Sequence, residues 1–103
     1  MVDQELDELR REYLAESAAK VREMEASVDS AQSPQSMERV TTLAHQLKGS
    51  GGSYGFGRIS AEAAEVEKAA ERLMSGESEA MAGVREHVAN LSDEIAKQQQ
   101  TLG

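Results

Sequence analysis

The sequence predicts an all-α protein that folds as an antiparallel up-down four-helix bundle. Apolar residues recur at helical spacing in four successive segments of the 103-residue chain. Short connections join these segments, so consecutive helices are expected to pack as antiparallel neighbours. The composition agrees, because only one proline, two tyrosines and one phenylalanine are present, which favours helix over sheet. We expect a single domain over residues 1–103.

The first helix is expected over residues 3–29. Its apolar stripe consists of Leu6, Leu9, Tyr13, Ser17, Val21, Met24 and Val28. The turn-like stretch VDSAQSP ends this helix. Within it, Ser33 and Pro34 suit the N-cap and the first position of the next helix.

The second helix is expected over residues 34–53, the third over 57–75 and the fourth over 78–99. One face of the second carries Val40, Leu43, Ala44, Leu47, Gly51 and Tyr54, and the chain then breaks at Gly55-Phe56-Gly57. The third helix, which Gly76 closes as a C-terminal signal, has its apolar residues at Ile59, Ala63, Val66, Ala70 and Leu73. Ser78 is the predicted cap of the fourth, whose stripe precedes the polar tail KQQQTLG and consists of Met81, Val84, Val88, Leu91 and Ile95.

Charge and composition exclude several classes of partner. A formal net charge of −8 argues against nucleic acid or an anionic membrane surface as the main partner. The chain has no cysteine, which suits a reducing compartment. Its first residues, MVDQELDELRREYLA, lack an apolar signal core, and no apolar run approaches the roughly 20 residues that span a bilayer. We therefore expect a soluble, cytoplasmic, monomeric domain.

Residues 44–57, AHQLKGSGGSYGFG, combine one histidine, one lysine and five glycines. A glycine inside a helix costs about 1 kcal/mol relative to alanine, so this composition needs a reason. On a helical wheel His45 lies about 140° from the core face, surrounded by Thr41, Lys48, Gly49 and Gly52. The histidine is therefore expected to project outward. The bare glycine backbone would let another protein bring a reactive group to its ring.

The stretch Ala44-His45-Gln46-Leu47-Lys48-Gly49-Ser50, followed by Gly55-Phe56, resembles the signature of histidine phosphotransfer (HPt) domains. This family includes the phosphorylated first domain of chemotaxis-type histidine kinases. The resemblance extends over essentially the whole chain, with four amphipathic helices and the histidine midway along the second. It implies that His45 accepts a phosphoryl group, that Lys48 helps to hold the phosphoryl oxygens, and that Gly49 opens the docking surface.

The resemblance also implies a role for Glu67. Many members carry an amide or a glutamate at this position of the following helix, hydrogen-bonded to the other imidazole nitrogen. On its own helix Glu67 lies about 80° from the apolar stripe, at the edge that faces the second helix. A cluster of His45, Lys48 and Glu67 is therefore expected, with Thr41, Gly49 and Gly52 as partner-docking positions around it.

Histidine suits a phosphoryl relay because its neutral ring, with an ordinary pKa of about 6.5, is a nucleophile near physiological pH. A carboxylate that accepts from Nδ1–H would fix the tautomer and leave the Nε2 lone pair free. Lys48 would add positive charge where the phosphoryl group carries negative charge. Phosphoryl transfer also usually needs Mg²⁺. The chain has no P-loop, no G-x-G-x-x-G motif and no aspartate cluster for a metal. We therefore expect no intrinsic cofactor, no metal site, no ATP binding and no catalysis by the chain alone.

His87 is the other histidine of the chain. It lies beside the apolar stripe of the fourth helix and is interpreted as a boundary residue. A metal site shared by His45 and His87 would need further ligands at suitable spacing, and none stands out.

The sequence thus predicts a phosphocarrier of a two-component phosphorelay. His45 would take a phosphoryl group from a sensor histidine kinase or a receiver aspartate and pass it to a response-regulator receiver domain, which would supply Mg²⁺ and dock on the second and third helices. The chain would be a free-standing protein, complete at about this length, or the first domain of a chemotaxis-type kinase. Glu67 and Gly55-Phe56 slightly favour the kinase version.

Two other classes of function stay open. One is an inert helical adaptor, which the helical glycines argue against because alanine would make such a bundle more stable. The other is an enzyme that uses His45 and Glu67 as acid and base, which the lack of an enclosed pocket argues against.

Overall fold

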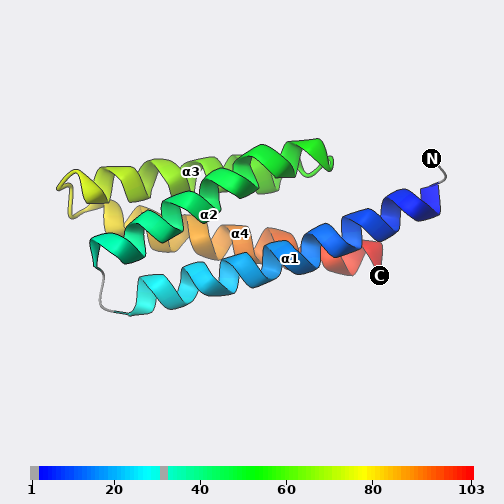
Figure 1. Cartoon of the computed structure of the whole chain (residues 1–103), viewed down its shortest axis with the longest axis horizontal. Helices are drawn as coiled ribbons and strands as arrows, with labels where there is room; N and C mark the ends of the chain where they lie inside the picture. Colours follow the sequence, from blue (N-terminus) through cyan, green and yellow to red (C-terminus); the bar gives the residue numbers. More distant parts are fainter. Residues whose placement is uncertain (1–2, 31–32) are drawn as a thin grey trace.

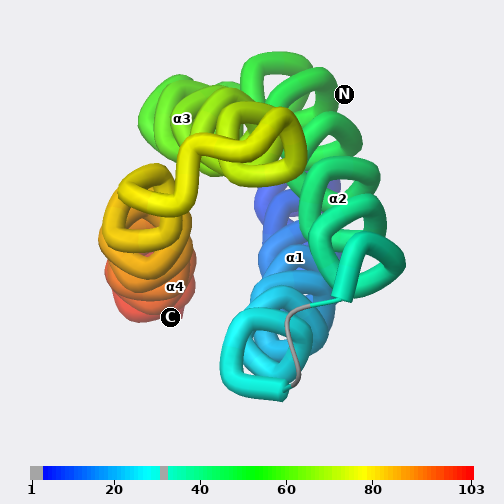
Figure 2. The backbone as a smooth tube through the Cα atoms, turned by 90° about the vertical axis from the view of Figure 1, so that its left-hand side faces the viewer, coloured from blue at the N-terminus to red at the C-terminus, as the bar shows by residue number. Residues whose placement is uncertain are grey.

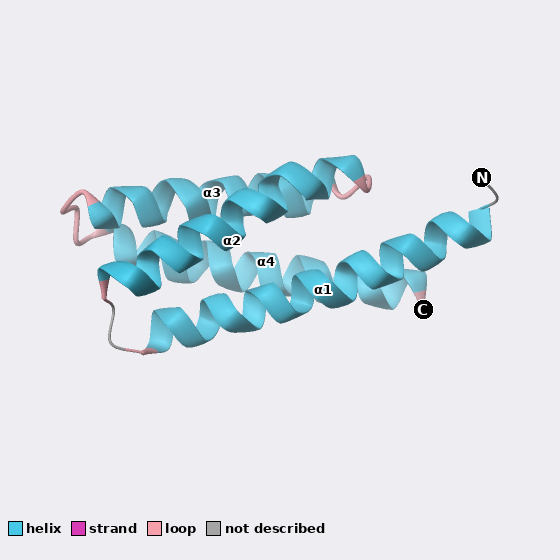
Figure 3. Cartoon of the chain, in the orientation of Figure 1, coloured by secondary structure: helices cyan, strands magenta, loops and turns pink. Residues whose placement is uncertain are grey.

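The computed structural model describes residues 3–30 and 33–103 and consists of four α-helices. They are α1 (Asp3–Asp29), α2 (Pro34–Ser53), α3 (Gly57–Met74) and α4 (Ala80–Leu102), and the described part of the chain contains no strand (Figures 1 and 3). Each helix packs against its neighbours in a ring, α1 against α2 and α4, and α3 against α2 and α4 (Figure 2). The predicted all-α four-helix bundle is confirmed.

The bundle is elongated, with principal extents of 48 × 20 × 19 Å. The first turns of α1 and the last turns of α4 extend past the connection between α2 and α3 (Figure 1). No helix in residues 3–30 and 33–103 is long and apolar enough to cross a membrane.

The predicted apolar faces form the core, with two differences on α1. Leu9 is predicted to lie in the core stripe but is 41% exposed, next to Arg10, which donates to the Tyr54 carbonyl at the very end of α2. Leu14 was not in the predicted stripe but is fully buried. The reason is that α1 packs against both α2 and α4, so its buried arc is wider than one stripe.

The ends of the helices follow local hydrogen bonding. Ser33 caps α2 as predicted, since its hydroxyl oxygen accepts from the backbone N–H of Ser36 and Pro34 takes the first helical position. Three helices are followed by a glycine at positive φ, Gly55 (85°) after α2, Gly76 (106°) after α3 and Gly103 (82°) after α4. After α2 and α3, paired backbone bonds close the last turn in the pattern that favours glycine. The predicted turn before α2 includes residues 31 and 32, which lie outside the described residues.

The start and end of α4 differ from the prediction. The helix begins at Ala80, and the predicted cap Ser78 makes no side-chain capping bond. Instead, the N–H groups of Ala80 and Met81 bond to the carbonyls of Glu77 and Ser78, so a tight turn leads directly into the helix. At the other end, the predicted polar tail stays helical to Leu102, which packs against the core.

Three aromatic rings join α1 to the connection between α2 and α3. The ring of Tyr13 stacks on Tyr54 with centroids 4.3 Å apart and on Phe56 with centroids 5.9 Å apart. The Tyr13 hydroxyl also forms a hydrogen bond of 2.8 Å with Ser50 Oγ. The middle of α1 is thereby fixed against the end of α2.

Candidate functional site

His45 projects from the middle of α2 and its side chain is 71% exposed. The core face of the same helix is buried through Leu43, Ala44 and Leu47. The ring nitrogen Nδ1 lies 2.8 Å from Oε2 of Glu67 on α3. The structure therefore places the imidazole on the surface, with one edge held by the neighbouring helix.

Glu67 binds both predicted partners at once. Its Oε2 faces His45, and its Oε1 accepts a hydrogen bond of 3.1 Å from Lys48 Nζ. The Glu67 side chain is only 13% exposed. Burial raises its pKa, but the hydrogen bonds and charges of Lys48 and His45 outweigh this effect and leave the pKa of Glu67 below its usual value.

This contact sets the tautomer of His45. An ionised carboxylate can only accept hydrogen bonds, so Nδ1 carries the proton and donates a hydrogen bond to Glu67. The lone pair of the neutral ring is then on Nε2, away from the carboxylate. The ring is thus oriented as a nucleophile with a defined reactive atom.

The glycines around His45 have different structural reasons. A Cβ at Gly51 would lie 2.9 Å from the backbone nitrogen of Ser60, so glycine is needed there for α2 to approach α3. A Cβ at Gly49 or Gly52 would meet nothing within 4 Å, and both positions are exposed. Contacts within the chain therefore explain Gly51 but neither Gly49 nor Gly52. Thr41, the third predicted docking position, is half-buried, and its hydroxyl donates to the Met37 carbonyl.

Ser60 makes a contact beside the site that the sequence pattern does not predict. Its hydroxyl donates a hydrogen bond of 2.6 Å to the backbone carbonyl of Lys48, which ties α3 to α2 beside the site. Ser60 precedes Glu67 by seven residues and so shares its face of α3. That spacing is the signal that could have identified it.

His87 lies apart from the His45 cluster, on α4. Its side chain is 25% exposed, as expected of a boundary residue, and its Nδ1 lies 2.8 Å from Oε2 of Glu62 on α3. The pairing with Glu62 was not predicted. The two histidines thus contact different carboxylates of α3. Among the residues that the structure describes, no group of three or more His, Cys, Asp or Glu side chains is arranged to hold a metal ion.

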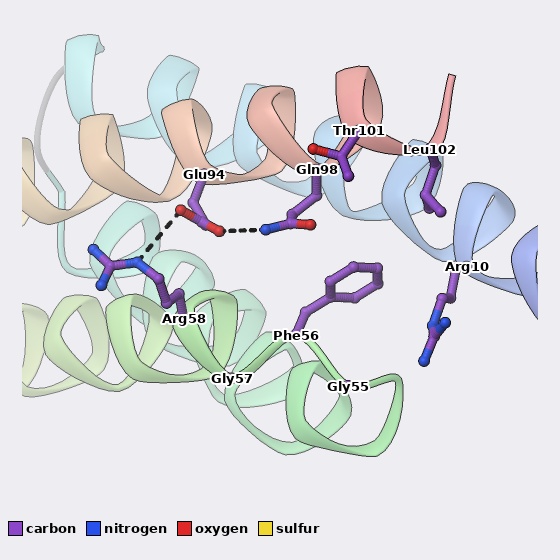
Figure 4. A pocket seen from close by; sticks show the side chains of 9 residues that line it. All are labelled: Arg10, Gly55, Phe56, Gly57, Arg58, Glu94, Gln98, Thr101 and Leu102. Atoms are coloured by element: carbon purple, nitrogen blue, oxygen red, sulfur yellow. Dashed lines mark hydrogen bonds and ion pairs between the residues drawn. The ribbon is translucent and has the colours of Figure 1, made fainter.

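An open cavity of about 400 Å³ lies at the end of the bundle, beside the connection between α2 and α3 (Figure 4). Arg58 reaches across it to the buried carboxylate of Glu94 at 3.5 Å, and Gln98 donates to the same carboxylate at 2.7 Å. None of the predicted site residues lines this cavity. The His45 cluster is therefore an open helical face, separate from this cavity.

Comparison with known proteins gives one match. A family model described as the Hpt domain matches residues 8–99, a span that reaches from α1 to α4 and includes His45, Lys48 and Glu67. No curated protein and no solved structure matches the chain at a significant level.

Proposed function

The chain belongs to the Hpt domain family, the phosphotransfer modules of phosphorelay signalling, and we propose that His45 is the residue that takes up and passes on the phosphoryl group. The observation that carries this proposal is the hydrogen bond between His45 Nδ1 and Glu67, on a ring that is otherwise largely exposed. In this proposal Lys48 and Glu67 assist the transfer, and Thr41, Gly49 and Gly52 belong to the docking surface.

The chemical step uses the free ring nitrogen. The Nε2 lone pair attacks the phosphorus of an aspartyl phosphate on the partner, in line with the bond to the aspartate oxygen. The N–P bond forms, the O–P bond breaks, and the aspartate leaves as a carboxylate. Nδ1 keeps its proton, so the ring becomes positively charged and the Glu67 carboxylate balances that charge. The reverse step returns the group to a receiver aspartate.

Lys48 is placed to neutralise the incoming charge. Its ammonium binds the same carboxylate as the His45 ring, so the lysine lies beside the imidazole before any phosphoryl group arrives. A phosphoryl group on Nε2 would bring about two negative charges to this face, and charge-assisted hydrogen bonds from an ammonium are the strong kind.

The partner completes the machinery. We propose that the chain needs no cofactor of its own, and that a receiver domain supplies Mg²⁺ together with its aspartate. A sensor histidine kinase would be the other partner. In this proposal the domain acts as a monomer in the cytoplasm.

A chemotaxis-type kinase is the second setting that fits the site. The specific observation in its favour is that a carboxylate at position 67, and not an amide, holds the imidazole. The full-length protein encoded by the gene tests whether the chain is part of such a kinase. A kinase core encoded downstream of residue 103 in the same reading frame would support this second setting.

The test is transfer from phosphorylated receiver domains of the source organism, with acid-labile phosphate on the chain as the readout. We expect the wild type to become labelled and the His45→Gln variant to stay unlabelled. His87→Gln is the matched control, because His87 is also held by a glutamate at 2.8 Å, and it should label like the wild type. Equal labelling of His45→Gln would show that the proposal is wrong.

A further inference from the structure

The Ser60 hydroxyl bonds in a different way from the other hydroxyls of the bundle. In residues 3–30 and 33–103, the other serine and threonine hydroxyls that donate to a backbone carbonyl reach one three or four residues earlier in the chain. This local bond is the usual one for a hydroxyl in a helix. Ser60 Oγ instead crosses from α3 to the carbonyl of Lys48 on α2, at 2.6 Å. The bond therefore links two helices.

Lys48 is held by α3 at two points. Ser60 binds its backbone carbonyl, and Glu67 binds its side-chain ammonium at 3.1 Å. Ser60 and Glu67 are seven residues apart, which corresponds to about 10 Å along α3. The same Glu67 carboxylate holds His45 Nδ1 at 2.8 Å. The Ser60 bond and the His45 cluster therefore depend on the same placement of α3 against α2.

The contact at Gly51 sets how close the two helices come. A Cβ at Gly51 would lie 2.9 Å from the backbone nitrogen of Ser60, so the two backbones touch here. A glycine has no side chain that could interlock with the facing helix, so this contact resists sliding of α3 along α2 only weakly. A hydrogen bond resists sliding, because its length and angle tolerate only small changes. At this crossing, the Ser60 hydroxyl is thus the contact that fixes the register.

We propose that Ser60 is a positioning residue for phosphoryl transfer, whose bond to the Lys48 carbonyl fixes α3 along α2 and so keeps the Glu67 carboxylate on His45 Nδ1. This inference rests on the proposed function. Functional groups must be held to within about 0.5 Å of their working geometry. Without the Ser60 bond, α3 shifts and Nδ1 is uncovered for part of the time. The neutral ring then carries its proton on Nε2 in a fraction of the molecules, and these molecules lack the reactive lone pair.

The first measurement is the tautomer of His45, which requires no phosphoryl transfer. Imidazole nitrogen NMR shifts at about pH 9, where imidazoles are neutral, give the fraction of rings with the proton on Nδ1. We expect Ser60→Ala to raise the fraction with the proton on Nε2 several-fold over the wild type. Ser60→Thr keeps the hydroxyl and should keep the wild-type fraction. Ser17→Ala is the matched control, because Ser17 Oγ also donates to a backbone carbonyl, at 2.8 Å, but within α1.

The second measurement is the rate of labelling by phosphoramidate, a small donor that needs no docking surface. The His45 Nε2–P bond forms, the donor's P–N bond breaks and ammonia leaves. We expect Ser60→Ala to be labelled about threefold to tenfold more slowly, because misplaced groups lose rate steeply with distance. Ser17→Ala and Ser60→Thr should be labelled at the wild-type rate. In a Glu67→Ala background, Ser60→Ala should cause no further slowing, because the carboxylate that it positions is gone.

Two results would overturn the inference. One is a Ser60→Ala protein that keeps the wild-type tautomer or the wild-type labelling rate. The other is the same slowing by Ser60→Ala with and without the Glu67 carboxylate, since Ser60 would then act through the stability of the bundle and not through Glu67. A wild type that takes no phosphoryl group from phosphoramidate or from any receiver would instead contradict the proposed function. The tautomer would still show whether Ser60 holds Glu67 on the His45 ring.

Discussion

Glu67 decides how His45 is presented, and its substitution tests this directly. In Glu67→Gln the amide oxygen can still accept from Nδ1–H, but the negative charge that balances the phosphorylated ring and pairs with Lys48 is gone. We expect the single-turnover rate of transfer from a phosphorylated receiver to fall about tenfold or more, as it does when a group that orients a functional histidine is removed.

Glu62→Gln is the control for this measurement. Glu62 lies on the same helix and holds the other histidine at the same distance of 2.8 Å, so its substitution removes an equivalent negative charge away from the site. We expect its transfer rate to stay near the wild-type value. If both variants slow equally, Glu67 acts through the stability of α3 and not through the imidazole.

The lowered pKa of Glu67 also predicts how stability depends on pH. Burial raises this pKa, but the hydrogen bonds and charges of Lys48 and His45 lower it below the ordinary 4.5. The charged form is thus favoured in the folded state. Its stabilising contribution is complete above about pH 5 and is lost as the pH falls through the lowered folded-state pKa. The difference in unfolding free energy between wild type and Glu67→Gln should therefore shrink as the pH falls from about 5 through the lowered folded-state pKa of Glu67.

Urea denaturation of both proteins across this range measures that difference. Other carboxylates titrate in both chains alike, so the comparison isolates Glu67. A gap of the same size at both ends of the range would contradict the assigned contacts.

At the scale of the elements, two adjacent glycines of α2 should respond to alanine in opposite directions. In Gly51→Ala the new Cβ would lie 2.9 Å from the backbone of Ser60, so α2 and α3 must separate, at a cost of about 1–3 kcal/mol. In Gly52→Ala the new Cβ meets nothing within 4 Å, so the gain in helix propensity should stabilise the protein by about 0.5–1 kcal/mol. Urea denaturation at neutral pH measures both changes.

The same pair separates stability from docking. Gly52→Ala is expected to slow transfer from a receiver although the protein becomes more stable, because the methyl group stands on the open face beside His45. Labelling by phosphoramidate should stay unchanged. Unaltered transfer from the receiver would mean that Gly52 is not part of the docking surface.

The elements show how far the sequence alone predicts this structure. Helical periodicity places four helices and the outward direction of His45, because both depend on residues close in the chain. Periodicity does not predict the exposure of Leu9 or the burial of Leu14. A helical wheel carries no information on where the neighbouring helices end or on how many of them pack against one helix. It also fails at Ser78, where a backbone turn takes the place of a side-chain cap.

Contacts between helices are the other part that the sequence does not predict. The bonds of Ser60 to Lys48 and of His87 to Glu62 depend on how far one helix is shifted along the next, and periodicity within one helix carries no information on that shift. Glu67 was identified because it occupies the matching position of a known family. The distance of 2.8 Å to His45 came only with the structure.

At the scale of the whole molecule, the site and one of the main contacts of α1 lie on different interfaces. The His45 cluster is built from α2 and α3 alone. The stack of Tyr13 on Tyr54 and Phe56 joins α1 to the far end of α2 and the connection that follows. Stability that comes from α1 should therefore be separable from the chemistry at His45.

Substitution of Tyr13 tests this separation. Tyr13→Ala removes a buried aromatic ring and should lower the free energy of unfolding by about 3–5 kcal/mol. Tyr13→Phe keeps the stacked rings and loses only the hydrogen bond to Ser50, so a loss of about 1 kcal/mol is expected. For both variants, the rate of labelling by phosphoramidate per folded molecule should equal that of the wild type, with the folded fraction measured by circular dichroism under the same conditions. Tyr13→Phe is expected to stay folded even if Tyr13→Ala does not. A slower labelling rate of Tyr13→Phe would therefore show that α1 helps to shape the site through Ser50, two residues beyond Lys48.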